Sequence, residues 1–198
     1  MKKNKKEKKR LCNPGLTAKG ATLDEMLDCY CRIFRPVLKK YLGMFRSSNL
    51  ANMMDYATGS VCPCCKHCHP HQWRVAKKSL REFEKKLKAI IDRLKQAKNF
   101  EKLYELVCEA RVWGIGPVTL YDAALRIGAC ISILPRDFVY LHGGAKIPGN
   151  GRSGKLSISS FVPLFAAYGM TAYEIEEFLC CFHSLLSEKA IIVTIPSK

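Results

Sequence analysis

The feature that most constrains the fold is the spacing of apolar residues between Arg74 and Lys98. Placed on a helical projection, these apolar side chains fall within an arc of about 120°, which is typical of an amphipathic helix. The residues of this apolar face are Leu80, Phe83, Leu87, Ile90, Ile91 and Leu94. A helix of this kind has to bury its apolar face against other elements, so the segment predicts a helical domain with a packed core.

The opposite face of the same segment is mostly positive. Its basic residues lie within about 60° of Arg81 on either side, and only Glu84 and Asp92 lie close to this stripe. The stripe consists of Arg74, Lys77, Lys78, Arg81, Lys85, Lys88 and Lys95. Contact with a phosphate backbone requires segregated positive charge, whereas a solvated helix face usually mixes both signs. We therefore expect this face to bind nucleic acid, with a merely solvated face as the alternative.

The chain as a whole is strongly basic. It contains 33 Lys and Arg against 17 Asp and Glu in 198 residues, a formal net charge of +16. Residues 1–10, MKKNKKEKKR, have a single apolar residue, so residues 1–19 are predicted to form a disordered basic tail. A polyanion is the expected partner. No segment approaches the roughly 20 apolar residues of a membrane span. An anionic membrane surface would be served by the same charge, but a membrane is not the expected partner.

The cysteines and the N-terminal residues indicate a reducing compartment. The chain has 11 Cys, an odd number, and its lysine run is followed by LCNPGLTAKG rather than by the apolar core of a secretory signal. Reduced thiols are therefore expected. We predict a cytoplasmic, nucleoid-associated protein, with other proteins of a nucleoprotein complex as further partners.

A glycine-rich break separates two helical segments in the middle of the chain. The first helix is predicted from Phe100 to Val112, and Pro117 suits the first position of a second helix that has Gly128 as its C-cap. The segment VWGIGPVTLYDAALRIG resembles a helix-hairpin-helix motif, placed at about residues 100–128.

This resemblance implies binding to nucleic-acid backbone rather than to particular bases. Glycines let the hairpin approach a phosphate, and free N–H groups at the start of the second helix bind the anion. The implied contact residues are Gly114, Ile115, Gly116, Val118 and Thr119. Two positions that are often polar in such motifs are Pro117 and Val118, so a hairpin that only packs two helices is the alternative.

The same arrangement resembles the helix-hairpin-helix DNA glycosylases, but the catalytic positions differ. In the matching stretch, Val139 to His142, Tyr140 stands where the family has its catalytic Asp. Val118 stands where bifunctional members have a lysine nucleophile. Neither residue can do the family's chemistry, because an apolar side chain forms no Schiff base and a phenol is a poor base near neutral pH. A binding protein is favoured over a glycosylase-like or nuclease enzyme, for which the remaining catalytic candidates are Tyr121, Asp122 and His142.

Cysteine and histidine residues gather in the segment CPCCKHCHPH. Four of them occur at every third position: Cys62, Cys65, Cys68 and His71. Three thiolates and an imidazole form a ligand set that Zn²⁺ accepts readily. The spacing of the three cysteines also occurs in bacterial ferredoxin-type iron–sulfur clusters. Zinc is favoured over an iron–sulfur cluster, and a metal-free polar loop is the third alternative.

Three segments carry a second resemblance. HPHQWR, YDAALRIG and YLHGGAK are similar to an uncharacterised family of bacterial proteins. This resemblance implies no activity, so His69 and His71 are site candidates on their chemistry alone.

A glycine-rich loop lies near residue 150. It contains three basic residues, Lys146, Arg152 and Lys155. The sequence GNGRSGKL fits the first positions of a Walker A loop, but Leu156 replaces the Ser or Thr that holds Mg²⁺, and no strand pattern precedes it. We predict a basic lip over bound nucleic acid, with a plain linker as the alternative.

The remaining segments are predicted to be helical. Thr22 suits the N-cap of a helix that runs to about residue 45, and Pro36 should kink or divide it. SISSFVPLFAAYG and TAYEIEEFLCCFHSLL read as two more helices, the second opening with a capping box of Thr171 and Glu174. Two cysteines of the last helix are expected to be buried, Cys180 and Cys181.

Together these patterns predict the fold class and the function. We expect an all-α fold without a substantial sheet, in which residues 20–198 form a single helical domain of six to eight helices around one helix-hairpin-helix. The expected function is sequence-independent binding of nucleic acid, DNA in preference to RNA, through the hairpin, the basic helix and the basic tail. The alternatives are a glycosylase-like or nuclease enzyme acting on DNA and a protein-interaction subunit of a larger nucleoprotein assembly.

Overall fold

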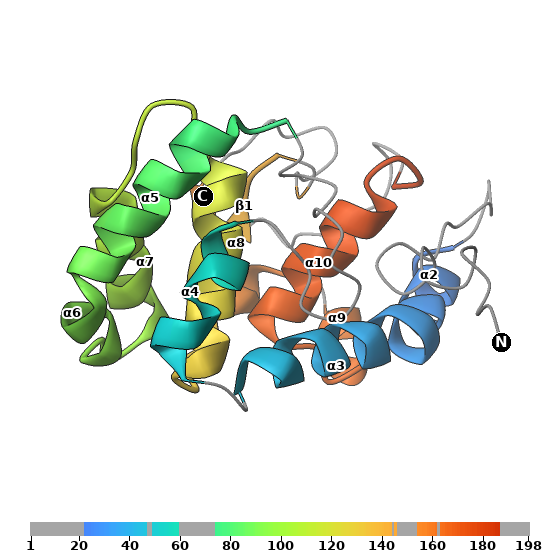
Figure 1. Ribbon diagram of the computed structural model, residues 1–198. Helices are drawn as coiled ribbons and strands as arrows, with labels where there is room; N and C mark the ends of the chain where they lie inside the picture. Colours follow the sequence, from blue (N-terminus) through green and yellow to red (C-terminus); the bar gives the residue numbers. More distant parts are fainter. Residues whose placement is uncertain are drawn as a thin grey trace, which may run out of the picture. The chain divides into compact units, whose positions relative to one another are not determined.

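A computed structural model describes residues 22–46, 49–59, 74–143, 145, 154–161 and 163–186. These residues are mostly helical and include one small two-stranded sheet (Figure 1). No helix among them is both long enough and apolar enough to span a bilayer. The predicted tail, the CPCCKHCHPH segment, Lys146 and Arg152 lie outside the described residues.

The chain divides into two compact groups of residues. The terminal unit combines the described residues up to Leu38 with those from Pro135 onward, and the central unit is Lys39–Leu134. The prediction of a single domain over residues 20–198 stays a prediction.

Helices pack around α8 (Pro117–Cys130) in the central unit. α4 (Leu50–Thr58) and α7 (Phe100–Glu109) both contact α8, and α5 (Lys77–Ala89) contacts α4. Most residues of α8 are buried, and alanines and a glycine allow its neighbours to approach closely. The remaining helices of this unit are the C-terminal part of α3 (Arg35–Arg46) and α6 (Ile91–Lys95).

The amphipathic pattern between residues 74 and 98 is confirmed, with one interruption. Leu80, Phe83 and Leu87 are buried on α5, and Leu94 is buried on α6. The predicted single helix is divided at Ile90, whose φ of −113° lies outside the helical region. The Ile90 N–H donates to the Leu87 carbonyl three residues before it, so α5 ends in a tight turn before α6 begins.

The prediction that Gly128 is the C-cap of the second hairpin helix was wrong. α8 continues to Cys130, and the Ile133 N–H donates to the Gly128 carbonyl at 2.7 Å. A Cβ atom on Gly128 would overlap the carbonyl oxygen of Ile133. The position requires glycine because the chain folds back across the helix there, and not because the helix ends.

The terminal unit begins with the predicted helix start and the predicted division. Thr22 caps α2 (Leu23–Cys29) in a reciprocal capping box with Glu25. Residues Tyr30–Phe34 form a π-helical turn, η1, in which the Arg35 N–H donates to the Tyr30 carbonyl. Pro36 follows directly and has no N–H to donate, so the α-helical hydrogen-bond series is broken where α3 begins.

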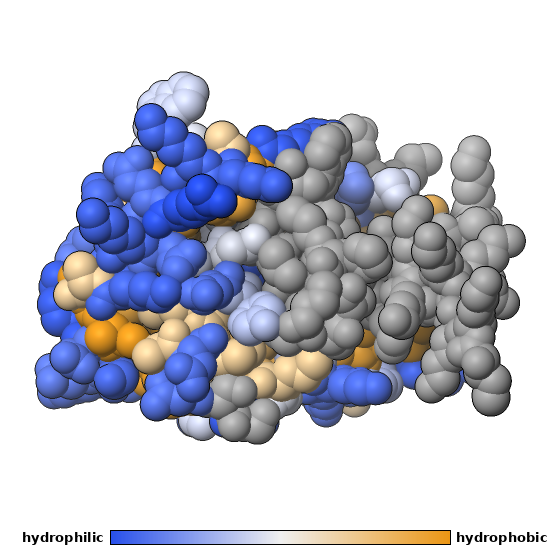
Figure 2. All heavy atoms as spheres, in the orientation of Figure 1, coloured by the Kyte–Doolittle hydropathy of each residue, from blue (hydrophilic) through white to orange (hydrophobic). Residues whose placement is uncertain are grey.

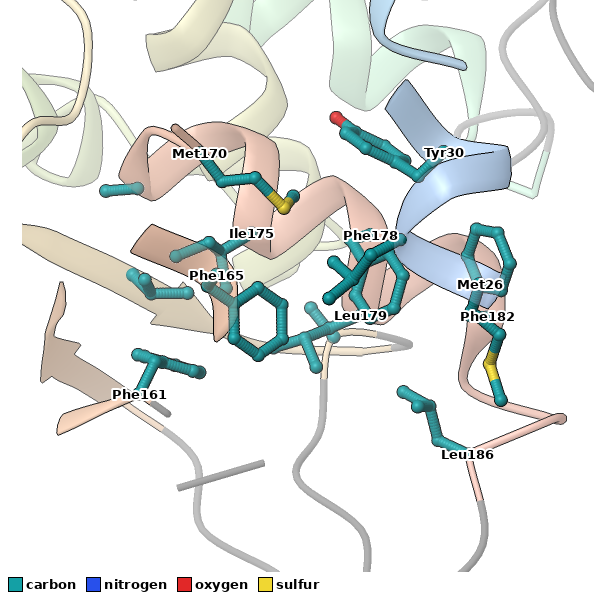
Figure 3. Packing of buried hydrophobic residues seen from close by; sticks show 14 of the residues in the cluster. Met26, Tyr30, Phe161, Phe165, Met170, Ile175, Phe178, Leu179, Phe182 and Leu186 are labelled. Atoms are coloured by element: carbon teal, nitrogen blue, oxygen red, sulfur yellow. The ribbon is translucent and has the colours of Figure 1, made fainter. Parts of the chain in front are cut away.

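Aromatic side chains form the core of the terminal unit, as Figure 3 shows. The ring of Phe178 contacts Tyr30 and Phe165 edge to face, and stacks on Phe182 with centroids 4.7 Å apart. These rings come from η1, α9 (Pro163–Ala167) and α10 (Ala172–Phe182). The core therefore joins the two ends of the described chain.

The expectation of a mostly helical fold without a substantial sheet is confirmed for the described residues, which contain one small two-stranded sheet. β1 (Phe138–Leu141) pairs antiparallel with β2 (Gly154–Ser157), and the short 3₁₀ helix η2 (Ile158–Ser160) follows. The segment SISSFVPLFAAYG was predicted to be one helix, but it contains the short 3₁₀ helix η2 and, in its second half, the α-helix α9. Val139 and Leu141 are buried in the aromatic core, so tertiary packing favours a strand in this apolar run.

Two smaller expectations also change. A strand, β1, does precede the glycine-rich loop, but the loop leads into the strand β2, so Lys155 does not stand at the start of a helix as in a Walker A loop.

On α10 the capping box of Thr171 and Glu174 is confirmed. Cys180 is only partly buried and Cys181 is exposed, contrary to the expectation that both are core residues.

Candidate nucleic-acid interface

The connection between α7 and α8 is a hydrogen-bonded turn. The Ile115 N–H donates to the Val112 carbonyl at 3.2 Å, and Gly114 has a φ of +85°. A positive φ at the third position is the mark of a type II turn, in which glycine is favoured. The Arg111 Nε donates to the Ile115 carbonyl at 2.9 Å and closes the turn from its other side. The turn is therefore held in one conformation by its own residues.

Gly114 also brings this turn against α5. A Cβ atom on Gly114 would lie 3.1 Å from the Ser79 hydroxyl, and Ser79 is buried on α5. The close approach is thus to a neighbouring helix within the protein. Gly116, in contrast, has open space where a Cβ atom would lie. Of the two hairpin glycines, Gly116 is the one that leaves room for an external group.

The other hairpin residues implied by the motif differ in exposure. Ile115 and Thr119 are buried and Val118 is partly buried, so the side chains of Ile115 and Thr119 pack inside the unit. The N-cap of α8 is Gly116, which offers no side chain to cap the helix, and Pro117 has no N–H. Backbone N–H groups, those of Gly116, Val118 and Thr119, are what this end of the helix offers to an anion.

Four residues of the predicted basic stripe are exposed on α5: Lys77, Lys78, Arg81 and Lys85. None of the four forms an ion pair with another of the described residues. Figure 2 shows hydrophilic residues gathered over α5. The stripe therefore presents positive charge that the described part of the protein does not neutralise.

Lys88 differs from these four residues. Its Nζ lies 2.8 Å from the Asp55 carboxylate of α4 and 2.6 Å from the Glu84 carboxylate. The hydrogen bonds to Asp55 and Glu84 raise the pKa of Lys88, and the hydrogen bond from Lys88 lowers the pKa of Asp55. Lys88 is thus partly neutralised within the protein, and the available stripe is shorter than the sequence predicted. Arg74 is exposed just before α5.

Trp113 is an exposed aromatic residue that the sequence patterns did not predict as a site residue. This side chain is 92% exposed, although Val112 beside it and Ile115 are buried. It occupies the second position of the hydrogen-bonded turn, directly before Gly114. The available signal was an aromatic residue inside a glycine turn, a place where a large apolar side chain has no local structural role.

Two of the predicted catalytic candidates belong to the central unit. Tyr121 is 1% exposed, and its ring contacts Phe100 and Tyr104 edge to face. The Asp122 carboxylate lies 3.4 Å from the guanidinium of Arg126.

Arg126 in turn joins three helices from within the unit. Its Nε donates to the Tyr41 hydroxyl at 2.7 Å and its Nη1 donates to the Ala57 carbonyl at 3.0 Å. Asp122 thus stands beside a buried cation that links α8 with α3 and α4. This geometry is typical of a structural ion pair.

The third catalytic candidate, His142, belongs to the terminal unit. Its Nε2 lies 3.8 Å from the Glu176 carboxylate, and both side chains are largely buried. Of the predicted basic lip, Lys155 is the member within the described residues, and its Nζ lies 4.4 Å from the centre of the Phe138 ring. His142 and Lys155 are therefore both engaged inside their own unit.

The predicted metal ligands Cys62, Cys65, Cys68 and His71 lie outside the described residues, as do His69 and the tail. Among the residues that are described, no group of three or more potential ligands comes together. Metal binding by the CPCCKHCHPH segment stays a prediction.

Comparison with known proteins assigns no family to the chain. Neither a protein-family model nor a curated protein nor a solved structure matches it. The function has to be inferred from the protein's own residues and their geometry.

Proposed function

We propose that this protein binds nucleic acid without sequence preference, through the α5 basic face and the adjacent α7–α8 turn. The α5 basic face is defined as Lys77, Lys78, Arg81 and Lys85. The observation that carries the proposal is that these cations are exposed and form no ion pair with another of the described residues, beside a turn that contacts the same helix at Ser79. Phosphate groups would supply the missing counter-charge.

The position of the lysines on α5 strengthens this proposal. Lys77 and Lys78 occupy the first turn of the helix, which contains no acidic residue and has no side-chain cap. Positive charge at a helix N-terminus is unfavourable because the helix dipole is positive there, at a cost of about 0.3–1 kcal/mol for each charge. A bound anion would remove this repulsion. Lysines at these positions therefore favour anion binding, although they lower the stability of the helix.

DNA is the nucleic acid that we propose, because residues 100–128 resemble a helix-hairpin-helix. Backbone N–H groups of Val118 and Thr119 would then add phosphate contacts to those of the lysines. We infer a binding role rather than a catalytic one, since Asp122 has a buried cationic partner and Tyr121 is enclosed by aromatic rings.

The test compares two double variants with the same change in charge. Lys77→Gln with Lys78→Gln removes two cations of the α5 basic face. Arg93→Gln with Lys102→Gln removes two exposed cations outside the predicted stripe that have carboxylate partners, Glu109 and Glu105. Binding to a labelled DNA duplex would be measured by fluorescence anisotropy over a range of salt concentrations.

We expect the first pair to weaken binding and to reduce the slope of log K against log salt by about 2, because two phosphate contacts are lost. The control pair should leave that slope nearly unchanged. Equal effects of the two pairs would show that only net charge matters, and binding that is insensitive to salt would overturn the proposal. Binding to an acidic protein but not to DNA would also overturn it.

A further inference from the structure

Trp113 combines high exposure with a rigid support. Its side chain is 92% exposed. The turn that carries it is fixed by the Ile115 to Val112 hydrogen bond, and the Arg111 guanidinium binds the Ile115 carbonyl. The residues on either side of the Trp113–Gly114 pair, Val112 and Ile115, are anchored in the core. The indole is therefore displayed by a turn that has little freedom to withdraw it.

The turn itself does not require an aromatic residue at this position. The second position of a type II turn accepts most residues and favours proline, whereas its third position requires a positive φ, which Gly114 supplies. An exposed indole also adds nothing to the core. The side chain thus has no role in the described part of the fold.

The surroundings of Trp113 are charged rather than apolar. Through Gly114 the turn contacts Ser79, which lies between Lys78 and Arg81 on α5. Among the described residues of the central unit, no other large hydrophobic side chain is exposed. A protein partner that docks through apolar contacts would need a wider apolar patch than one indole. An anionic ligand with flat aromatic groups fits this surface better.

We propose that Trp113 stacks on an unpaired base of single-stranded DNA whose phosphates are bound by the α5 basic face. Proteins that bind single strands combine a basic surface with aromatic side chains on which bases stack, and this combination tolerates any sequence. In an intact duplex the bases are already stacked and paired, so an exposed indole gains contact only where they are separated. The protein accordingly prefers single strands to duplex. This inference rests on the proposed function.

The experiment measures the affinity of Trp113→Ala, Trp113→Phe and the unchanged protein for two labelled probes. One probe is an oligothymidylate of about 20 nucleotides, longer than the sites that single-strand binding folds occupy. The other is a mixed-sequence duplex of similar length. Because one stacked base contributes about 1–3 kcal/mol, Trp113→Ala should weaken single-strand binding about tenfold. Duplex binding should change less than twofold, and Trp113→Phe should retain most of the single-strand affinity.

Thermal unfolding provides the control for folding, since an exposed side chain can be replaced at little cost in stability. A second readout is the emission of Trp113 in a Trp73→Phe background, which leaves one of the chain's two Trp residues. We expect oligothymidylate to quench this emission more strongly than duplex does.

The outcomes separate the two proposals. If Trp113→Ala lowers both affinities equally, or neither, the stacking inference is overturned. If the Lys77→Gln with Lys78→Gln variant then still binds both probes more weakly with a smaller salt slope, the proposed function stands without it. If the unchanged protein binds neither probe, the proposed function fails, and the stacking inference fails with it.

Discussion

The helices α5 and α10 use charge in opposite ways. On α5 the cations Lys77, Lys78 and Arg81 are exposed and form no ion pair with another described residue. On α10 the carboxylates are turned inward. Glu174 is 2% exposed and binds the Arg35 guanidinium at 3.1 Å, and Glu177 accepts a hydrogen bond from the Tyr30 hydroxyl at 2.8 Å. Acidic charge on α10 is paired within its unit, whereas these basic side chains of α5 have no carboxylate partner among the described residues.

This difference explains why a strongly basic chain can still fold into a packed structure. A buried carboxylate is tolerated only when partners replace its water, and Glu174 has two kinds of partner. Besides Arg35, it accepts the backbone N–H of Thr171 at 2.9 Å as part of the capping box of α10. An exposed lysine keeps its hydration shell and needs no partner. Charge inside the protein is therefore structural, and charge on α5 is available for binding.

The largest expected effect tests the structural side of the comparison. Glu174→Ala leaves the partly buried Arg35 without its carboxylate and removes the capping box of α10. We expect the free energy of unfolding to fall by about 3 kcal/mol, as for other broken buried pairs. Chemical denaturation would measure this loss. Glu82→Ala, at an exposed position of α5, is a control that should change stability by less than about 0.5 kcal/mol. A Glu174→Ala variant as stable as the unchanged protein would contradict a structural role.

Alkaline pH should lower the stability of the terminal unit, which contains Tyr30. Burial, together with the nearby charge of Glu177, raises the pKa of Tyr30 far above its ordinary value. The unfolded chain releases this proton near pH 10, but the folded chain keeps it. Stability is therefore fully present below about pH 10 and falls by up to about 1.4 kcal/mol for each further pH unit.

Tyr30→Phe should make this alkaline loss shallower in denaturation experiments between about pH 9 and pH 11. The variant loses the hydrogen bond to Glu177, so its stability at neutral pH should be lower by about 1 kcal/mol. Tyr104 adds to the remaining slope, because burial raises its pKa to about 12. Tyr168→Phe is the comparison variant, since the hydrogen bond to the exposed Asp24 carboxylate raises the pKa of Tyr168 with little burial, and it should change the slope less than Tyr30→Phe does. An unchanged slope in Tyr30→Phe would mean that this phenol does not stay neutral in the fold.

The smallest expected effect is on α5, where a substitution should raise the free energy of unfolding instead of lowering it. Lys78→Glu replaces a cation in the first turn of the helix with an anion, which the helix dipole favours. We expect the free energy of unfolding to rise by about 0.5 kcal/mol while DNA binding weakens. Denaturation and anisotropy on the same preparation would measure both quantities. A loss of stability together with a loss of binding would place Lys78 among the structural charges, as on α10.

Several features of this fold could be predicted from local sequence patterns. The apolar spacing of residues 80–94, the N-cap at Thr22, the capping box begun by Thr171, and an interruption of the first helix at Pro36 were all predicted and found. Pro117 also begins α8 as predicted. Each of these features depends on residues within about one or two helical turns of one another, so the sequence records it directly.

The remaining features of the fold depend on tertiary contacts, which the sequence patterns could not predict because the contacting residues lie far apart in the sequence. Gly128 is internal to α8 since Ile133 folds back on it, and Lys88 of the predicted basic stripe is partly neutralised by Asp55 of α4. The β1–β2 pairing joins two short runs across a long loop, which helical spacing could not reveal. Exposure is likewise a property of the packed molecule. A sequence shows that Trp113 is apolar, but only the packing around Val112 and Ile115 leaves its indole outside.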